Sequence, residues 1–96
     1  MSEELTEAIN SLKEKLTGQE IEGSIKFEIE GLGSIIIDNG NIEESNQEAD
    51  CTLIGDLETF KEIFSGELNS TAAFMGGRLK VEGSMSVAMK YNSVLS

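Results

Sequence analysis

The sequence predicts an α+β fold in which amphipathic helices pack against short strands. Apolar residues recur every three or four positions over residues 3–16, alternate with polar residues over 21–30, and return to helical spacing after Asp56. Glycine-containing turn signals lie between the strand-like segments. With 96 residues and 39% apolar side chains, we expect one domain covering residues 1–96, built around one modest core.

The first expected element is a helix over residues 3–16. Ser2 is a suitable N-cap, and Gly18 lies just past the segment, where helices commonly end. Charged side chains fill the opposite side of this helix. We therefore expect one apolar face to meet the core, formed by Leu5, Ile9, Leu12 and Leu16.

A half-buried strand comes next, because apolar residues alternate with mostly charged ones over 21–30. The glycines at 31 and 33 reverse the chain into a second strand over 34–38. Three consecutive isoleucines at 35–37 indicate that both faces of this second strand are covered at its centre.

The segment Asp38-Asn39-Gly40 is a strong signal for a two-residue hairpin. The chain therefore returns into a short polar strand over 41–44. An acidic loop then leads to a fourth strand over 51–54. Cys51 has no basic neighbour in the sequence that would stabilise a thiolate, so we expect a packed core cysteine.

The second half is mainly helical. Asp56 is a good N-cap for a helix that ends at Gly66, and Ser70 or Thr71 can cap a short helix that ends at the glycines 76–77. The apolar face of the first of these helices is formed by Leu57, Phe60, Ile63 and Phe64.

A fifth strand is expected over 78–82, with its apolar and basic side chains on opposite faces. Residues 83–84 begin a last helix that runs to the C-terminus. This helix is apolar over a wider arc than one sheet face would cover.

Composition excludes several classes of function. The chain has no histidine and one cysteine, so it cannot form a Ser-His-Asp triad, an imidazole metal site, an internal disulfide or a cysteine-rich zinc site. We therefore expect no catalytic residues, no metal and no cofactor. The net charge of −11 opposes nucleic-acid binding and permits at most transient membrane contact. No signal peptide is recognisable, and we expect a cytoplasmic protein.

Two local charge patterns are candidate sites. The carboxylates Glu28 and Glu30 share one strand face, and we interpret them as a solvated surface because nothing apolar surrounds them. From Leu68 to the end of the chain there are three basic residues, Arg78, Lys80 and Lys90, and one acidic residue. These three are either solvated side chains or, if they converge, a weak site for an anionic head group.

The strongest remaining signal is hydrophobic. Bulky, flexible apolar residues gather in the second half of the chain, and methionine adapts to irregular ligands as well as to irregular cores. Three explanations stay open from this pattern: an ordinary core, a lipid cavity and a dimer interface. The residues concerned are Phe60, Phe64, Ala73, Phe74, Met75, Met85, Ala88 and Met89.

An ordered set of short motifs in this region resembles one known family. These motifs are Ala49-Asp50-Cys51-Thr52-Leu53, Phe60, Gly66-Glu67-Leu68-Asn69, Ala73-Phe74, Gly77-Arg78-Leu79-Lys80-Val81, Gly83, Met85 and Ala88-Met89-Lys90. In this order and spacing they are similar to the second half of the sterol carrier protein type two domain. The chain departs from the family pattern at Ser70, where members often have a proline.

The resemblance implies a five-stranded mixed, mainly antiparallel sheet covered on one face by helices. It also implies an apolar tunnel that binds a fatty acid, a fatty acyl-CoA or a sterol without catalysis. The family's extra C-terminal segment is not matched, so we expect a tunnel mouth that is open or closed by a partner subunit. The residues expected to line the tunnel are Phe60, Phe64, Ala73, Phe74, Leu79, Val81, Met85, Ala88 and Met89.

An alternative of a different class uses the same apolar residues. The last helix could serve as a protein–protein interaction surface, joining two copies into a homodimer or docking to a partner. Under this alternative, the cavity between the helices and the sheet is collapsed.

Overall fold

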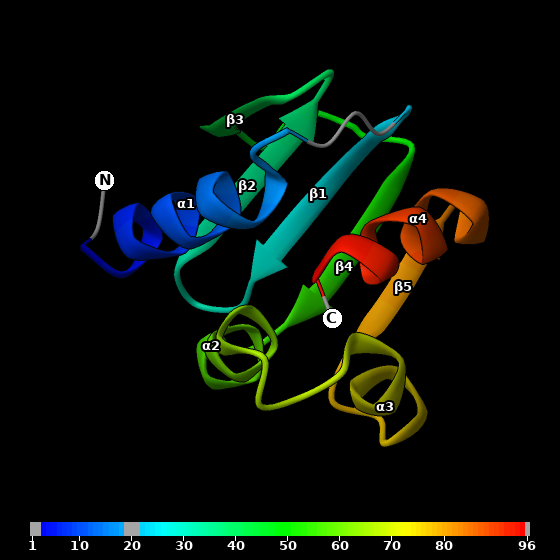
Figure 1. The fold of residues 1–96 in the computed structure, drawn as a ribbon. Coiled ribbons are helices and arrows are strands. Elements are labelled where there is room, and N and C mark those ends of the chain that lie inside the picture. Colours follow the sequence, from blue (N-terminus) through cyan, green and yellow to red (C-terminus); the bar gives the residue numbers. More distant parts are fainter. Residues whose placement is uncertain (1–2, 19–21, 96) are drawn as a thin grey trace.

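The computed structural model describes residues 3–18 and 22–95 and contains a five-stranded mixed sheet (Figure 1). The strand order is β3-β2-β1-β4-β5. The central pair β1–β4 is parallel, whereas the three other pairs are antiparallel, which confirms the expected sheet. The strands are β1 (Ser24–Ile29), β2 (Gly33–Asp38), β3 (Asn41–Glu44), β4 (Cys51–Gly55) and β5 (Lys80–Gly83).

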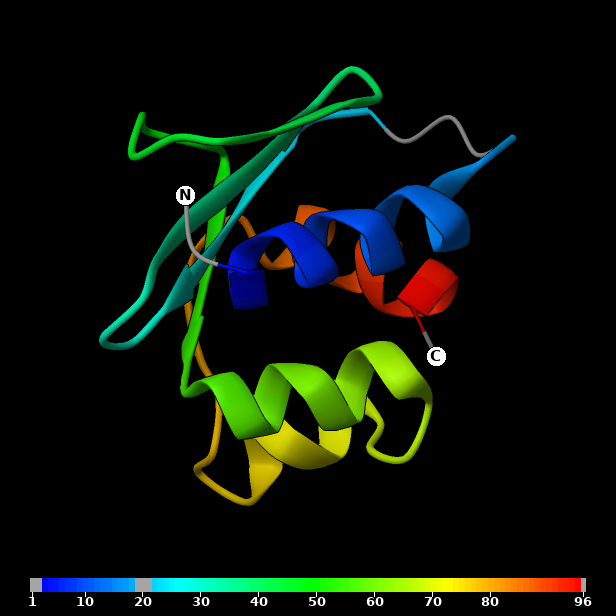
Figure 2. The same cartoon turned by 90° about the vertical axis from the view of Figure 1, so that its left-hand side faces the viewer.

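The helices lie on one side of this sheet and leave the other face uncovered by helices (Figure 2). α1 and α4 run across the sheet, and α2 and α3 lie beside one end of its central strands (Figure 1). The helix bounds are α1 (Glu3–Leu16), α2 (Leu57–Ser65), α3 (Ser70–Met75) and α4 (Met85–Leu95).

Strand alternation decides which side chains meet the helices. In β1, Ile25, Phe27 and Ile29 are buried, while the residues between them are partly exposed. In β2 the three isoleucines are all buried, so the prediction that both faces are covered is confirmed. Ile35 and Ile37 lie opposite Phe27 and Ile25 in the sheet, and Ile36 points to the other face.

The β2–β3 hairpin has the expected geometry. Asn39 and Gly40 have φ values of 51° and 85°, the left-handed conformations that a type I′ turn requires at both central positions. The helix that follows Asp56 also begins and ends as predicted: Asp56 caps α2 by accepting a hydrogen bond from the Thr59 N–H, and Gly66 ends it at φ 85°.

Three predicted boundaries are wrong by a few residues. β1 begins at Ser24 rather than at the predicted Ile21, because Gly23 has φ 96° and interrupts the extended chain; Ile21 itself and the predicted Ser2 cap lie outside the described residues. The N-cap of α3 is Asn69, whose side chain accepts a hydrogen bond from the Thr71 N–H. β5 begins at Lys80, since the chain before it is still held by hydrogen bonds to the end of α3.

The core lies between the helices and the inner face of the sheet. Phe27 packs edge to face against Phe60 and Phe64, with ring centres 5.7 and 5.8 Å away. α4 is tied into the same core by Tyr91, whose buried hydroxyl donates a hydrogen bond to the Gly23 carbonyl at 3.2 Å.

Candidate functional site

An apolar groove of about 310 Å³ lies between α3, α4 and the edge of the sheet formed by β4 and β5. The sheet contributes Leu53 and Val81, which are direct neighbours across β4 and β5. The two helices and the residue before β5 supply the remaining wall: Ser70, Thr71, Phe74, Met75, Leu79, Met85, Ala88, Met89 and Asn92.

The sequence of α4 explains how one helix serves both the core and this groove. Val87 and Tyr91 are four residues apart and are buried in the core. Met85, Ala88, Met89 and Asn92 follow spacings of three, one and three residues, and they form the neighbouring stripe that lines the groove. The wide apolar arc predicted for this helix therefore contains two adjacent faces with different surroundings.

Large apolar side chains are exposed in this groove. Phe74, Met75, Met85 and Met89 are 43, 81, 51 and 67% exposed, and they are all of the large exposed hydrophobic residues in the described part of the chain. Every one of them lines the groove. A protein surface rarely gathers its exposed apolar side chains at one place without a binding role.

The polar members of the groove wall lie at the starts and ends of helices. Ser70, the first residue of α3, is buried and its hydroxyl donates a hydrogen bond to the side-chain oxygen of Asn92 in the last turn of α4. This bond joins the two helices that form the walls. None of the eleven lining residues is charged, so the groove attracts neutral and apolar groups.

The structure brings six of the nine expected tunnel residues together in this groove: Phe74, Leu79, Val81, Met85, Ala88 and Met89. The other three, Phe60, Phe64 and Ala73, do not line the groove and are buried in the core. Phe60 and Phe64 also border a second, smaller hollow of about 200 Å³ between α1 and α2.

Five lining residues were not among the nine expected to line the tunnel. Asn92 could have been found by its spacing of seven residues from Met85, and Met75 belongs to the apolar set that the sequence already indicated as a core, cavity or interface. Leu53, Ser70 and Thr71 carry no sequence signal that separates a groove wall from a core or a helix start.

The structure does not bring the three basic residues together. Arg78 forms an ion pair with Glu62. Lys80 lies opposite Ile54 in β5, on the sheet face away from the helices, since the alternate residue Val81 faces the groove. Lys90 is exposed on α4 but does not line the groove.

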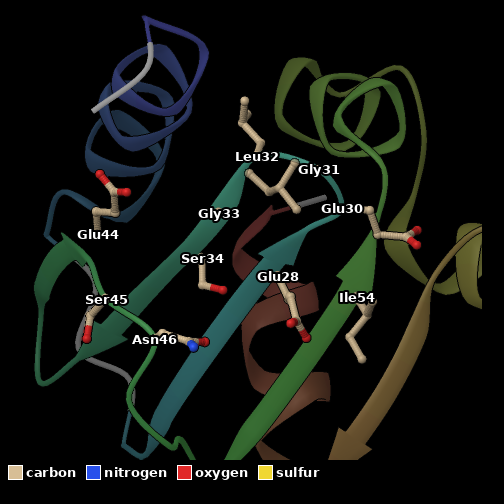
Figure 3. Close-up of a pocket in the computed structure, with 11 residues that line it drawn as sticks. Glu28, Glu30, Gly31, Leu32, Gly33, Ser34, Glu44, Ser45, Asn46 and Ile54 are labelled. Atoms are coloured by element: carbon tan, nitrogen blue, oxygen red, sulfur yellow. The ribbon is translucent and has the colours of Figure 1, made fainter.

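A larger hollow of about 730 Å³ lies on the opposite face of the sheet, next to the β1–β2 turn. Figure 3 shows Glu28, Glu30 and Glu44 at separate positions around it rather than pointing at one another. Within residues 3–18 and 22–95, no set of three or more carboxylates and thiols is arranged to hold a metal ion. This hollow mixes carboxylates with apolar side chains such as Ile29, Leu32 and Ile54, unlike the uncharged groove.

The one cysteine takes no part in the groove. Cys51 is fully buried, and desolvation raises the pKa of its thiol, which keeps it protonated and unreactive. Among the described helices, none is long and apolar enough to cross a membrane.

Comparison with known proteins places this fold. The chain is 37% identical over 59 residues to hydroxysteroid dehydrogenase-like protein 2 of Bos taurus, matching 59% of this chain and 14% of that protein. The crystal structure of sterol carrier protein 2 like 2 from Aedes aegypti has a TM-score of 0.80 at 18% identity and covers 95% of each chain.

A second solved structure is equally similar to this chain in fold. The sterol carrier protein 2 of Aedes aegypti in complex with palmitate has a TM-score of 0.80 at 20% identity, covering 100% of this chain and 97% of that one. The model of the SCP-2 sterol transfer family matches residues 3–96. The protein therefore belongs to the SCP-2 sterol transfer family.

Proposed function

We propose that this domain binds a lipid without catalysis, holding an acyl chain in the groove between α3, α4 and the sheet. The observation that carries the proposal is the gathering of every large exposed apolar side chain of the described residues in one uncharged groove. Family membership supports it, as does the palmitate named for a sterol carrier protein of the same fold. The proposal concerns this domain alone, because the chain spans 14% of the bovine relative.

The size of the groove suits part of an extended acyl chain. Ligand pockets range from about 300 to 1,000 Å³, so a groove of about 310 Å³ is at the small end. Burying a 16-carbon chain completely would contribute roughly 12 kcal/mol, at about 0.8 kcal/mol per methylene. Partial burial and the lost freedom of the ligand offset several kcal/mol. We therefore propose affinity in the micromolar range.

We propose that the acyl chain contacts Phe74, Leu79, Val81, Met85, Ala88 and Met89. The second hollow does not extend this surface, because α1 and α2 rather than α3 and α4 form its walls. The ion pair of Arg78 and the outward direction of Lys80 argue against a basic head-group site. A neutral polar group of the ligand would instead meet the Ser70–Asn92 hydrogen bond.

The test is the substitution Met85→Glu. A carboxylate in the groove wall must lose hydration when an acyl chain covers it, so palmitate affinity should fall by about a hundredfold or more. Affinity is measured by isothermal titration calorimetry, and folding is checked by circular dichroism. Ser86→Glu is the matched control, since it adds the same charge to an exposed neighbour that does not line the groove.

Equal palmitate affinity for the Met85→Glu and Ser86→Glu variants would contradict the proposal. The competing function is the interaction module, in which a second copy or another protein covers Met75, Met85 and Met89. Light scattering over a range of concentrations separates the two. A mass that rises to a dimer, with no binding of palmitate, would favour the interaction module.

A further inference from the structure

The sulfur atoms of this chain are unevenly distributed between surface and core. Of four methionines, three line the groove: Met75, Met85 and Met89. Their side chains are 81, 51 and 67% exposed. Cys51, the only cysteine, is fully buried in β4. An oxidant in solution therefore meets the thioethers of the groove before it meets the thiol.

A peroxide would change these thioethers in a defined way. The methionine sulfur attacks one peroxide oxygen, so that an S–O bond forms and the O–O bond breaks. The sulfur is oxidised by two electrons, and hydrogen peroxide is reduced to one molecule of water. The product, methionine sulfoxide, is polar where the thioether was apolar.

The groove is poorly suited to accept this change while a lipid is bound. Its sheet side consists of Leu53 and Val81, and its few polar side chains lie at the Ser70 end of α3 and at Asn92. A sulfoxide covered by an acyl chain would lose its hydration without a new hydrogen bond along most of the wall. The sulfoxide oxygen would instead remain hydrogen-bonded to solvent, so that water stays in the groove where the acyl chain would lie.

We propose that Met75, Met85 and Met89 are peroxide-modification sites and that their oxidation releases the bound lipid. This inference rests on the proposed lipid binding. Reduction of the sulfoxides by the two methionine sulfoxide reductases returns the groove to its apolar form. Under this proposal, peroxide lowers the affinity of the groove for lipid, and the reductases restore it.

The experiment treats the full chain with hydrogen peroxide and locates added oxygen by peptide mass spectrometry. We expect one added oxygen on each of Met75, Met85 and Met89, with the Cys51 thiol still free for alkylation after unfolding. Palmitate affinity should fall at least about tenfold, equivalent to about 1.4 kcal/mol, and recover after treatment with both reductases. Oxidation of Cys51 ahead of these methionines, or sulfoxides without loss of affinity, would overturn the inference.

The matched control is the triple variant Met75→Leu, Met85→Leu and Met89→Leu, which keeps apolar side chains but removes the thioethers. Its palmitate affinity is compared before and after peroxide, whatever the starting value. The ratio should stay near one. A loss equal to that of the natural chain would mean that peroxide acts elsewhere, and would overturn the inference.

Failure of lipid binding itself is recognised separately. If the untreated protein does not bind palmitate, the proposed function fails, and the fluorescence of anilinonaphthalene sulfonate then reports the apolar character of the groove. Peroxide should lower that fluorescence in the natural chain and leave it unchanged in the triple leucine variant. An equal response of both proteins would overturn the role of the three methionines.

Discussion

Asp56 shows how one side chain at the edge of the core holds a helix in place. It precedes α2, and its carboxylate accepts a hydrogen bond from the Thr59 N–H at 2.8 Å. Hydrogen bonding from Thr59 lowers the pKa of Asp56. The ionised cap therefore stabilises the start of α2, the helix that carries the buried residues Phe60 and Phe64.

The sign of the pKa shift predicts how this cap responds to acid. Because the folded pKa is below the unfolded value of about 3.9, the stabilisation is complete above that value and is lost as pH falls through the folded pKa. Asp56→Ala should lower the melting temperature at pH 7, and the difference from the natural chain should shrink in acid. Differential scanning calorimetry of both proteins, at pH 7 and again below the folded pKa of Asp56, measures this difference in melting temperature.

Asp56→Asn is the matched control, because asparagine caps a helix without titrating in this range. Its difference in melting temperature from Asp56→Ala should stay nearly constant as the pH falls. A difference between the natural chain and Asp56→Ala that persists undiminished in strong acid would contradict the role of the ionised carboxylate.

Single positions also show the limit of sequence interpretation. Phe60 and Phe74 are both aromatic residues within helices of the second half, yet Phe60 is fully buried and Phe74 is 43% exposed in the groove. A spacing pattern indicates that a side chain lies on an apolar face but does not tell what covers that face. Six of nine expected wall residues therefore lie in the groove, and three in the core.

The passage from β5 into α4 depends on a glycine. Gly83 is the last residue of β5 and has φ 90°, and a Cβ added there would overlap the carbonyl oxygen of Asp50. That carbonyl accepts a hydrogen bond from the Ser84 N–H at 2.8 Å, one residue before α4 begins. The direction of α4, and with it the groove wall, is set at this point.

Gly83→Ala should therefore destabilise the fold more than Gly77→Ala does. Gly77 also has a positive φ of 80°, but nothing lies within 4 Å of an added Cβ. Both variants lose about 1–2 kcal/mol to the left-handed backbone, and the overlap with Asp50 adds about 1–3 kcal/mol for Gly83→Ala. Urea unfolding measures the difference, and equal free energies of unfolding for the two variants would contradict the prediction.

At the scale of elements, the sequence predicts the kinds of structure better than their arrangement. The periods of α1 and β1 and the Asn39-Gly40 turn are strong local signals, and these elements occur where expected. The parallel pairing of β1 with β4 has no local signal in the sequence, because the strand residues that lie side by side in the sheet are 26 positions apart along the chain. The family resemblance implied a mixed sheet but did not indicate which two strands are parallel, and residue patterns alone indicated neither.

The charge of the whole molecule is large for its size. The net charge is −11, and the longest dimension is 30 Å. The Debye length is about 30 Å at 0.01 M salt and about 10 Å at 0.1 M. In dilute buffer the acidic side chains therefore repel one another across the entire protein, and at higher salt only near neighbours do so.

Added salt should consequently stabilise the folded state. We expect the melting temperature to rise as sodium chloride increases from about 0.01 to 0.1 M, because screening reduces self-repulsion in the compact chain. Differential scanning calorimetry measures the rise, with potassium chloride as the control for ion identity. A melting temperature that is flat or falls over this range would show that the acidic charge does not limit stability.

The placement of the two shortest strands affects how readily copies of this protein aggregate at high concentration. β3 and β5 form the two edges of the sheet, each has four residues, and their exposed side chains include Glu43, Glu44, Lys80 and Glu82. A free strand edge is the usual template for fibril growth, and short charged edges resist it. The more apolar strands β2, β1 and β4 are all paired on both sides inside the sheet. Their backbone groups are therefore not available to pair with another copy, and we expect the folded protein to resist amyloid-like polymerisation.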